Sequence, residues 1–292
     1  MDIVGQLVFD GLAMGLVYVI LAGGFVLVLS VTQIFYIAYG MFYMVGAYAV
    51  WYGASVIHLP YFACLFIAPL LTAMLGMLTY ILVFHRLRFA EERFLSTITA
   101  ALGVSLMMSQ GGLLIFGTVP RSIPAIIPGM ISIMGANVST DKIVLIGLGI
   151  AVTLFLFVVY EKTSIGRAMR AVSYLPETAS LQGVNTNRVY TVTMGISCAV
   201  AGFAGGIIAP SYGLVPEMGQ NVLLPVLLMC MLGGMDSLFG AVIGGLVVGQ
   251  VLSFGQFFIG SSSQIVLFLV IAVVIFFRPN GLLGRKGDFG GF

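Results

Sequence analysis

Lysine, histidine, cysteine and acidic side chains do most protein chemistry, and this chain of 292 residues holds few of them. Its lysines are Lys142, Lys162 and Lys286, and none stands in the G-x-x-x-x-G-K-[ST] loop that wraps the phosphates of ATP. The histidines, His58 and His85, have neither a nucleophile and carboxylate pattern nor a metal-ligand spacing around them. The sequence therefore predicts neither ATP hydrolysis of this kind nor a hydrolase on this chain.

The cysteines and the late acidic residues are the remaining candidates for metal binding and for an ion path. Cys64, Cys198 and Cys230 lie inside apolar runs without paired spacing, so we expect packing residues with no disulfide and no metal site. Glu217 and Asp236 each stand beside glycine in an apparent break of the apolar pattern. A charge at the bilayer centre costs about 3 kcal/mol or more and persists where it is used. We favour a turn role for this pair, and ion coupling stays open as the alternative.

Residues 161–188 form the longest polar interruption, with the sequence EKTSIGRAMRAVSYLPETASLQGVNTNR. Serine is a preferred N-cap residue, so Ser164 predicts the start of a short helix. That helix carries Arg167 and Arg170, which would lie near phosphate groups if the segment rested on lipid.

A second short helix is predicted between Pro176 and Gly183, because proline just inside a helix and glycine just past its end are typical punctuation. It presents Ala179 and Leu181 as apolar knobs beside Glu177. A helix this short is unstable alone and needs a surface to lie against. Two interpretations remain equal: a helix that docks into a cytoplasmic partner and transmits its movements, and an amphipathic loop on lipid headgroups.

The elements that position these residues are membrane helices. Hydrophobic residues make up 60% of the chain, charged residues make up 8%, and the mean hydropathy is +1.15. This composition excludes an ordinary soluble domain, and a net charge of +2 is too small to indicate nucleic-acid binding. We predict a single all-α domain over residues 1–292, a polytopic membrane helix bundle in contact with lipid.

The apolar runs predict about eight or nine membrane segments. Six runs are clear: Leu7–Leu29, Ile34–Ile57, Tyr61–Phe84, Phe94–Phe116, Ile143–Tyr160 and Val189–Ser211. The first lacks the basic flank and cleavage signature of a signal peptide, so we expect a retained span. Residues 220–277 are long enough for three more, but Gly233, Gly234, Gly255 and Gly260 interrupt them. One piece is therefore either a full span or a half-helix that dips into the membrane.

Basic residues predict the orientation of the bundle. Ten of the twelve lysines and arginines fall in the loop 86–93, the segment 162–188 and the tail 278–286. Because lysine and arginine concentrate in cytoplasmic loops, we expect these three segments on the cytoplasmic side. The C-terminus then lies inside, and the N-terminus and residues 118–142 lie outside.

Glycines four residues apart predict close helix contacts, because glycine lets backbones approach where lipid supplies no hydrophobic drive to association. The pairs are Gly11 and Gly15, Gly202 and Gly206, Gly240 and Gly244, and Gly245 and Gly249. The dense set between Gly240 and Gly249 predicts a helix contact, with lower helix rigidity as the alternative role.

Several segments together resemble the permease family of bacterial ABC importers for branched-chain amino acids, urea and simple amides. They are residues 161–188, 232–249 (LGGMDSLFGAVIGGLVVG) and 278–285 (RPNGLLGR), joined by 11–18 and 46–48, and the likeness runs nearly end to end. The resemblance implies an importer in the bacterial inner membrane with two permease subunits, two cytoplasmic ATPase subunits that use ATP and Mg²⁺, and a periplasmic binding protein. It implies no cofactor on this chain.

The resemblance also makes 161–188 a cytoplasmic coupling segment. Its candidate ATPase contacts are Arg167, Arg170, Pro176, Glu177, Ala179, Leu181 and Gly183. The short N-terminus is similar to that of the shorter of two sister permeases, so a heterodimer is favoured over a homodimer. The rival hypothesis is a self-sufficient secondary carrier or channel, against which the shortage of buried charges argues.

One departure from the family concerns the second apolar run. Where the family usually has Asn-Phe-Ala-His-Gly, this chain has Tyr36-Ile37-Ala38-Tyr39-Gly40, which leaves the solute open among amino acids, urea, amides and aromatic acids. Five aromatic residues here are three and four apart, which predicts one helical face: Phe35, Tyr36, Tyr39, Phe42 and Tyr43. The alternatives are an interfacial aromatic belt and a passage for a small amphipathic solute.

A neighbouring span holds the polar residues Ser105, Ser109 and Gln110, which serve either such a passage or contact between helices. Our candidate pathway residues are Tyr18, Tyr36, Tyr39, Tyr43, Ser105 and Gln110.

Overall fold

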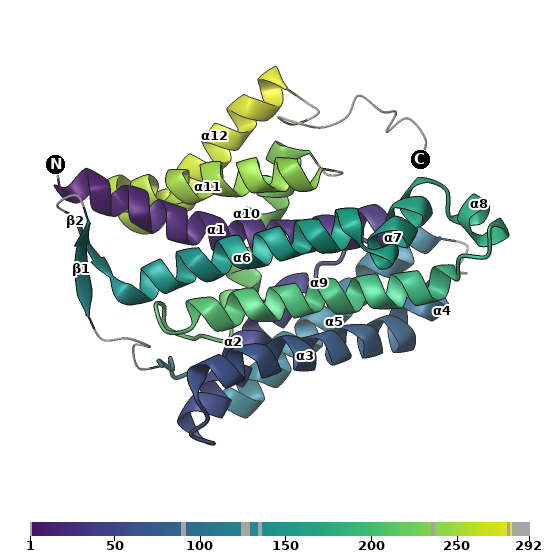
Figure 1. Ribbon diagram of the computed structural model, residues 1–292, viewed down its shortest axis with the longest axis horizontal. Coiled ribbons are helices and arrows are strands. Elements are labelled where there is room, and N and C mark those ends of the chain that lie inside the picture. Colours follow the sequence, from purple (N-terminus) through teal and green to yellow (C-terminus); the bar gives the residue numbers. More distant parts are fainter. Residues whose placement is uncertain are drawn as a thin grey trace.

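The computed structural model describes residues 2–88, 92–123, 129–133, 136–234, 237–278 and 281. Within these residues, nine apolar helices form the bundle of Figure 1: α1 (Asp2–Thr32), α2 (Tyr39–Ser55), α3 (Tyr61–Thr79), α5 (Arg93–Phe116), α6 (Thr140–Lys162), α9 (Thr186–Ile208), α10 (Met218–Gly233), α11 (Leu238–Ile259) and α12 (Ser263–Phe277). Six of the described helices are long and apolar enough to cross a membrane. The predicted polytopic helical bundle is confirmed.

Shorter elements connect the apolar helices. A π-helical turn, η1 (Tyr80–Phe84), and α4 (His85–Leu87) continue α3. The helices α7 (Ser164–Tyr174) and α8 (Pro176–Leu181) stand between α6 and α9. The strands β1 (Met130–Ile133) and β2 (Ala136–Ser139) form an antiparallel hairpin, and a 3₁₀ turn, η2 (Gly260–Ser262), joins α11 to α12.

The last third of the bundle follows the predicted breaks except at one position. Gly234 and Gly260 have φ angles of 104° and 65°, which favour glycine, and they end α10 and α11. Gly255 was expected to interrupt a helix, and this was wrong, because it is buried inside α11. Because Gly255 has no side chain, Ser263 at the start of α12 can pack against it. The Ser263 Cβ lies 3.3 Å from the position that a Cβ on residue 255 would occupy.

The second predicted span begins later than expected. Residues 33–36 are irregular, and α2 begins only at Tyr39. Thr32 is the cause, because its hydroxyl donates to the Val28 carbonyl at 2.7 Å and accepts from the Ile34 amide at 3.2 Å, which closes α1 locally. The predicted single helical face was therefore wrong, since Phe35 and Tyr36 precede the helix that carries Tyr39.

Glycine contacts hold the centre of the bundle together. A Cβ at Gly249 of α11 would collide with the backbone of Gly15 in α1, and one at Gly46 of α2 would collide with the backbone of Gly202 in α9. Gly240 of α11 is equally close to Gly233 of α10. The prediction that the glycines from Gly240 to Gly249 contact other helices is confirmed. Helix α1 lies at the centre, because 83% of its membrane-spanning stretch is buried, against 17% for α6.

The two ends of the bundle hold different elements. The N-terminus and the β1–β2 hairpin lie at one end, and α4, α7 and α8 lie at the other (Figure 1). The basic residues of the loop after α3 and of α7 therefore share an end, as the sequence predicted. Asp236 and most of the third basic segment lie outside the described residues.

Candidate functional site

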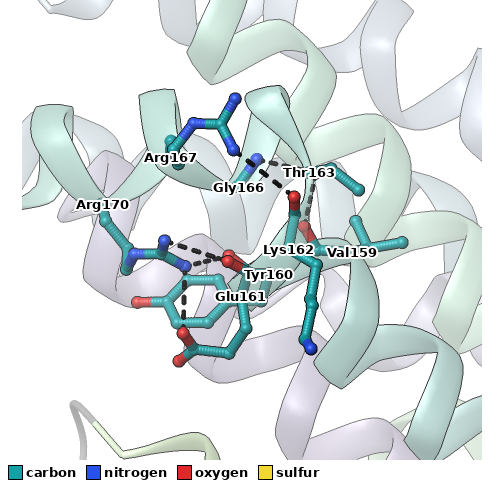
Figure 2. Close-up of polar contacts among 8 residues, drawn as sticks. All are labelled: Val159, Tyr160, Glu161, Lys162, Thr163, Gly166, Arg167 and Arg170. Carbon is teal, nitrogen blue, oxygen red and sulfur yellow. Dashed lines mark hydrogen bonds and ion pairs between the residues drawn. The ribbon is translucent and has the colours of Figure 1, made fainter.

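The corner between α6 and α7 is built around one threonine (Figure 2). Thr163 has an extended backbone, and its hydroxyl accepts from the Gly166 amide at 3.0 Å while it donates to the Val159 carbonyl at 2.5 Å. One side chain thus joins the end of α6 to the start of α7. The sequence had placed the cap at Ser164, which was wrong by one residue because Ser164 already has helical geometry.

Gly166 allows α7 to fold back on α6. A Cβ at this position would collide with the carbonyl groups of Val159 and Tyr160. Sequence reasoning missed this residue, although a glycine in the first turn of an otherwise helical segment indicates close backbone approach.

Arg170 closes the same corner from the other side (Figure 2). Its Nη1 donates to the Tyr160 carbonyl, and its Nη2 donates to the Glu161 carbonyl at 3.2 Å. The guanidinium also forms an ion pair with the Glu161 carboxylate at 3.5 Å and stacks 5.3 Å from the Tyr160 ring centroid. A cation at the last carbonyls of α6 is favoured by the helix dipole.

The two arginines predicted for this segment therefore differ in what they contact. Arg170 is half-buried and bonded to its own chain. Arg167 is exposed, with a long bond of 3.4 Å from its Nη1 to the Lys162 carbonyl. Arg167 is the one that is available to a partner.

The short helix α8 has well-formed ends. Pro176 begins it, and Gly183 follows it with a φ of 84°. The Gly183 amide donates to the Ser180 carbonyl at 3.0 Å, and the Val184 amide donates to the Ala179 carbonyl at 3.1 Å. This pair of bonds is the Schellman arrangement that ends many helices. The predicted helix between Pro176 and Gly183 is confirmed.

The faces of α8 differ from the expectation at one residue. Ala179 was expected to stand out beside Leu181, but it is only 4% exposed and packs against its own chain. Leu181 is 87% exposed, and Glu177 is exposed on the same short helix. Helix α8 therefore packs on the rest of the chain through Ala179, and Leu181 points outward.

The tyrosines among the pathway candidates are all buried inside the bundle. Tyr18, on α1, and Tyr43, on α2, are both buried. Tyr36 packs edge-on against Phe84 with ring centroids 5.3 Å apart. Tyr39 packs against Phe25 of α1 at 5.7 Å.

The hydroxyl of Tyr39 lies in the same kind of environment as those of Tyr36 and Tyr48, which are also buried without a hydrogen-bond partner among the described residues. A Cβ at Gly24 would collide with the Tyr39 oxygen, so the glycine makes room for the phenol. This oxygen is buried and has no hydrogen-bond partner among the residues that the structure describes. A polar group left in this state costs about 1–3 kcal/mol.

The polar candidates on α5 differ in how far they are buried. Ser105 is buried at 6% exposure, whereas Gln110 is exposed. The bond to a neighbouring helix is made by Ser109, whose hydroxyl accepts from Gln220 Nε2 of α10 at 3.3 Å. Gln220 was not singled out from the sequence.

Comparison with known proteins fixes the family. The family model described as branched-chain amino acid transport system / permease component matches residues 7–277. The high-affinity branched-chain amino acid transport system permease protein BraD of Pseudomonas aeruginosa is 26% identical over 295 residues, which cover 96% of this chain and 95% of BraD. The permease proteins LivH of Escherichia coli and Salmonella typhimurium, described in the same words, are each 26% identical over 301 residues, which cover 96% of this chain and 95% of LivH. No solved structure matches the chain significantly. Because the matches span nearly its whole length, the chain belongs to the permease component family of branched-chain amino acid transport systems.

Proposed function

We propose that this multi-pass membrane permease forms the translocation pathway of a bacterial ABC importer together with a second permease. Its solute is an amino acid or a related small amphipathic molecule. The names of BraD and LivH, which are permeases of branched-chain amino acid transport systems, support this class of solute. The two tyrosines at positions 36 and 39, where the family usually has asparagine and histidine, argue for a solute that differs from that of the relatives.

The coupling role of α7 and α8 rests on one observation above all. A helix of six residues is held in place by Ala179 and by its glycine cap, yet it leaves Leu181 almost fully exposed. Burying a leucine side chain stabilises a contact by about 1.5–3 kcal/mol, so this residue favours docking into a protein groove. We therefore assign the contact with a separate ATPase to the outward residues Arg167, Glu177 and Leu181. Arg170, Pro176, Ala179 and Gly183 hold the segment in shape.

The remaining partners follow from the same proposal. Two ATPase subunits supply ATP hydrolysis at the end of the bundle that holds α7 and α8, and a periplasmic binding protein delivers the solute at the end that holds the N-terminus. This orientation in the inner membrane is supported by the basic residues that gather around α4 and α7. Exposed apolar residues such as Met107 and Leu114 of α5, at 77% and 86%, suit lipid or a second permease. We favour a longer paralogue as that second permease.

The pathway proposal concerns Tyr18, Tyr36, Tyr39, Tyr43, Ser105 and Gln110. The buried Tyr39 hydroxyl supports it most directly, because a group without a partner in one conformation is explained if solute or water reaches it in another.

Affinity purification of the tagged chain from its native membrane tests the assembly. We expect an ATPase and a second, larger permease to purify with it, and loss of the ATPase when Glu177 and Leu181 are both changed to arginine. Purification of the chain with no ATPase, combined with solute uptake driven by an ion gradient alone, would establish the rival secondary carrier.

A further inference from the structure

Arg88, which follows α4, clamps the first turns of α9. Its Nη1 donates to Asn187 Oδ1 at 2.9 Å and to Thr186 Oγ1 at 3.4 Å. Its guanidinium carbon also lies 4.6 Å from the centroid of the Tyr190 ring. A cation at a helix N-terminus is disfavoured by the helix dipole, so general helix stabilisation does not explain the position of Arg88. The specific contacts to these three side chains do.

The clamped turn of α9 follows directly after α8. Only Val184 and Asn185 separate Gly183 from the first residue of α9. Both residues form hydrogen bonds. The Val184 amide donates to the Ala179 carbonyl of α8, and the Asn185 side chain accepts from the Arg188 amide at 3.1 Å. A displacement of α8 therefore moves the turn that Arg88 holds.

On its other side, Arg88 follows the π-helical turn η1. This geometry is rare, and single π-helical turns inside α-helices occur often at functional sites. Phe84, the last residue of η1, contacts Tyr36 edge-on at 5.3 Å and 86°. Tyr80, its first residue, lies 6.3 Å from Tyr190 between ring centroids. The turn thus contacts both α9 and the chain that leads into α2.

A small cavity lies beside these rings. Its volume is about 10 Å³, about the minimum that holds one water molecule, and its lining includes Tyr80, Phe84, Arg88 and Tyr190. The contact between η1 and α9 is therefore not fully packed.

We infer that Arg88 is a positioning residue that transmits the movement of α8 through the π-helical turn η1 to Tyr36 on the proposed solute pathway. This inference rests on the proposed function. Arg88 touches neither ATP nor solute, and it acts by keeping the start of α9 and the end of η1 in register.

Substitution of Arg88 by alanine tests the inference in the complete complex, reconstituted in sealed vesicles with its ATPase and second permease. We expect solute uptake per ATP hydrolysed to fall about tenfold, in the range of coupling between distant sites, while the ATPase stays bound. Arg86→Ala is the matched control, because Arg86 is an exposed arginine of α4, two residues before Arg88. It should leave the ratio unchanged.

Asn187→Ala supplies a second arm, because it keeps the arginine and removes its strongest acceptor. It should lower the same ratio, and the double variant should be no worse than Arg88→Ala alone. Arg88→Lys, which retains one charged donor, should recover part of the coupling. If Arg88→Ala does not assemble, Asn187→Ala decides the outcome.

Unchanged uptake per ATP in Asn187→Ala, or additive losses in the double variant, would overturn the inference. Failure of the unmodified complex to take up solute with ATP would overturn the proposed function instead, so the two failures are distinguishable.

Discussion

The crossing of α1 and α11 and the corner of α6 and α7 both depend on glycine, but they differ in what surrounds it. At the crossing, Gly15 and Gly249 bring two membrane helices into backbone contact in the buried centre. At the corner, Gly166 lies against carbonyl groups that also accept hydrogen bonds from Thr163 and Arg170. The crossing is held by packing, whereas the corner is held by hydrogen bonds and a cap.

This difference separates the part of the chain that makes the fold from the part that meets a partner. Lipid gives no hydrophobic drive to helix association, so the crossing needs small residues and tight packing. The corner and α8 keep their shape through local polar bonds, which leaves Leu181 free for contact with another protein. Substitutions at the crossing should therefore damage the bundle, and outward substitutions on α8 should damage coupling alone.

The largest effect is expected for Gly249→Ala. The new Cβ meets the backbone of Gly15 and Gly11, which cannot turn aside as a flexible side chain can, so we expect about 3 kcal/mol or more of destabilisation. Thermal unfolding of the detergent-solubilised chain, together with the yield of monodisperse protein, measures it. Gly147→Ala on α6, where a Cβ meets nothing within 4 Å, is the matched control. Equal behaviour of the two variants would contradict the packing role of the crossing.

Gly166→Ala should be next in size and confined to the corner. Its Cβ meets two carbonyl groups of α6, so α7 must shift and the ATPase should no longer bind, although the spans stay folded. Gly183→Ala offers a graded comparison, because a positive φ of 84° costs alanine only about 1–2 kcal/mol. ATPase binding should fall less for Gly183→Ala than for Gly166→Ala. The reverse order would show that the cap of α8 matters more than the corner.

Leu181→Arg should leave stability within about 0.5 kcal/mol of the parent, because the side chain is exposed. It should nevertheless remove ATPase binding, since a charge then enters an apolar contact. Gln182→Arg, which adds the same charge at the neighbouring exposed residue, should bind normally. Normal transport by Leu181→Arg would move the docking contact away from α8.

The smallest change in stability is expected for Tyr39→Phe. Removing a buried hydroxyl without a partner should be neutral or slightly stabilising in the conformation described here. Transport should still fall if solute or water meets this hydroxyl during the cycle. Tyr52→Phe, at an exposed position of the same helix, is the control. Unchanged transport by Tyr39→Phe would make the tyrosine a packing residue.

Much of this architecture could be predicted from the sequence, because hydropathy and glycine spacing are local signals. They indicated the apolar helices and the glycine-mediated contacts of α11, and proline and glycine indicated α8. The predictions that were wrong concern features that depend on tertiary contacts. The late start of α2 follows from the hydroxyl bonds of Thr32, and the inward face of α8 follows from where Ala179 packs.

The contacts of Arg88 with the start of α9 likewise could not be predicted from the sequence. They join residues about a hundred positions apart, and neither the arginine nor Asn187 stands in a motif. The π-helical turn that precedes Arg88 has no simple sequence signal either.

Solute uptake into sealed vesicles, with this chain and its second permease present throughout and the ATPase either present or omitted, tests the central claim most directly. The account predicts uptake of an amino acid or related solute only when the ATPase, ATP and the binding protein are all present, and none when Leu181→Arg replaces the parent. Concentrative uptake without any ATPase would contradict it.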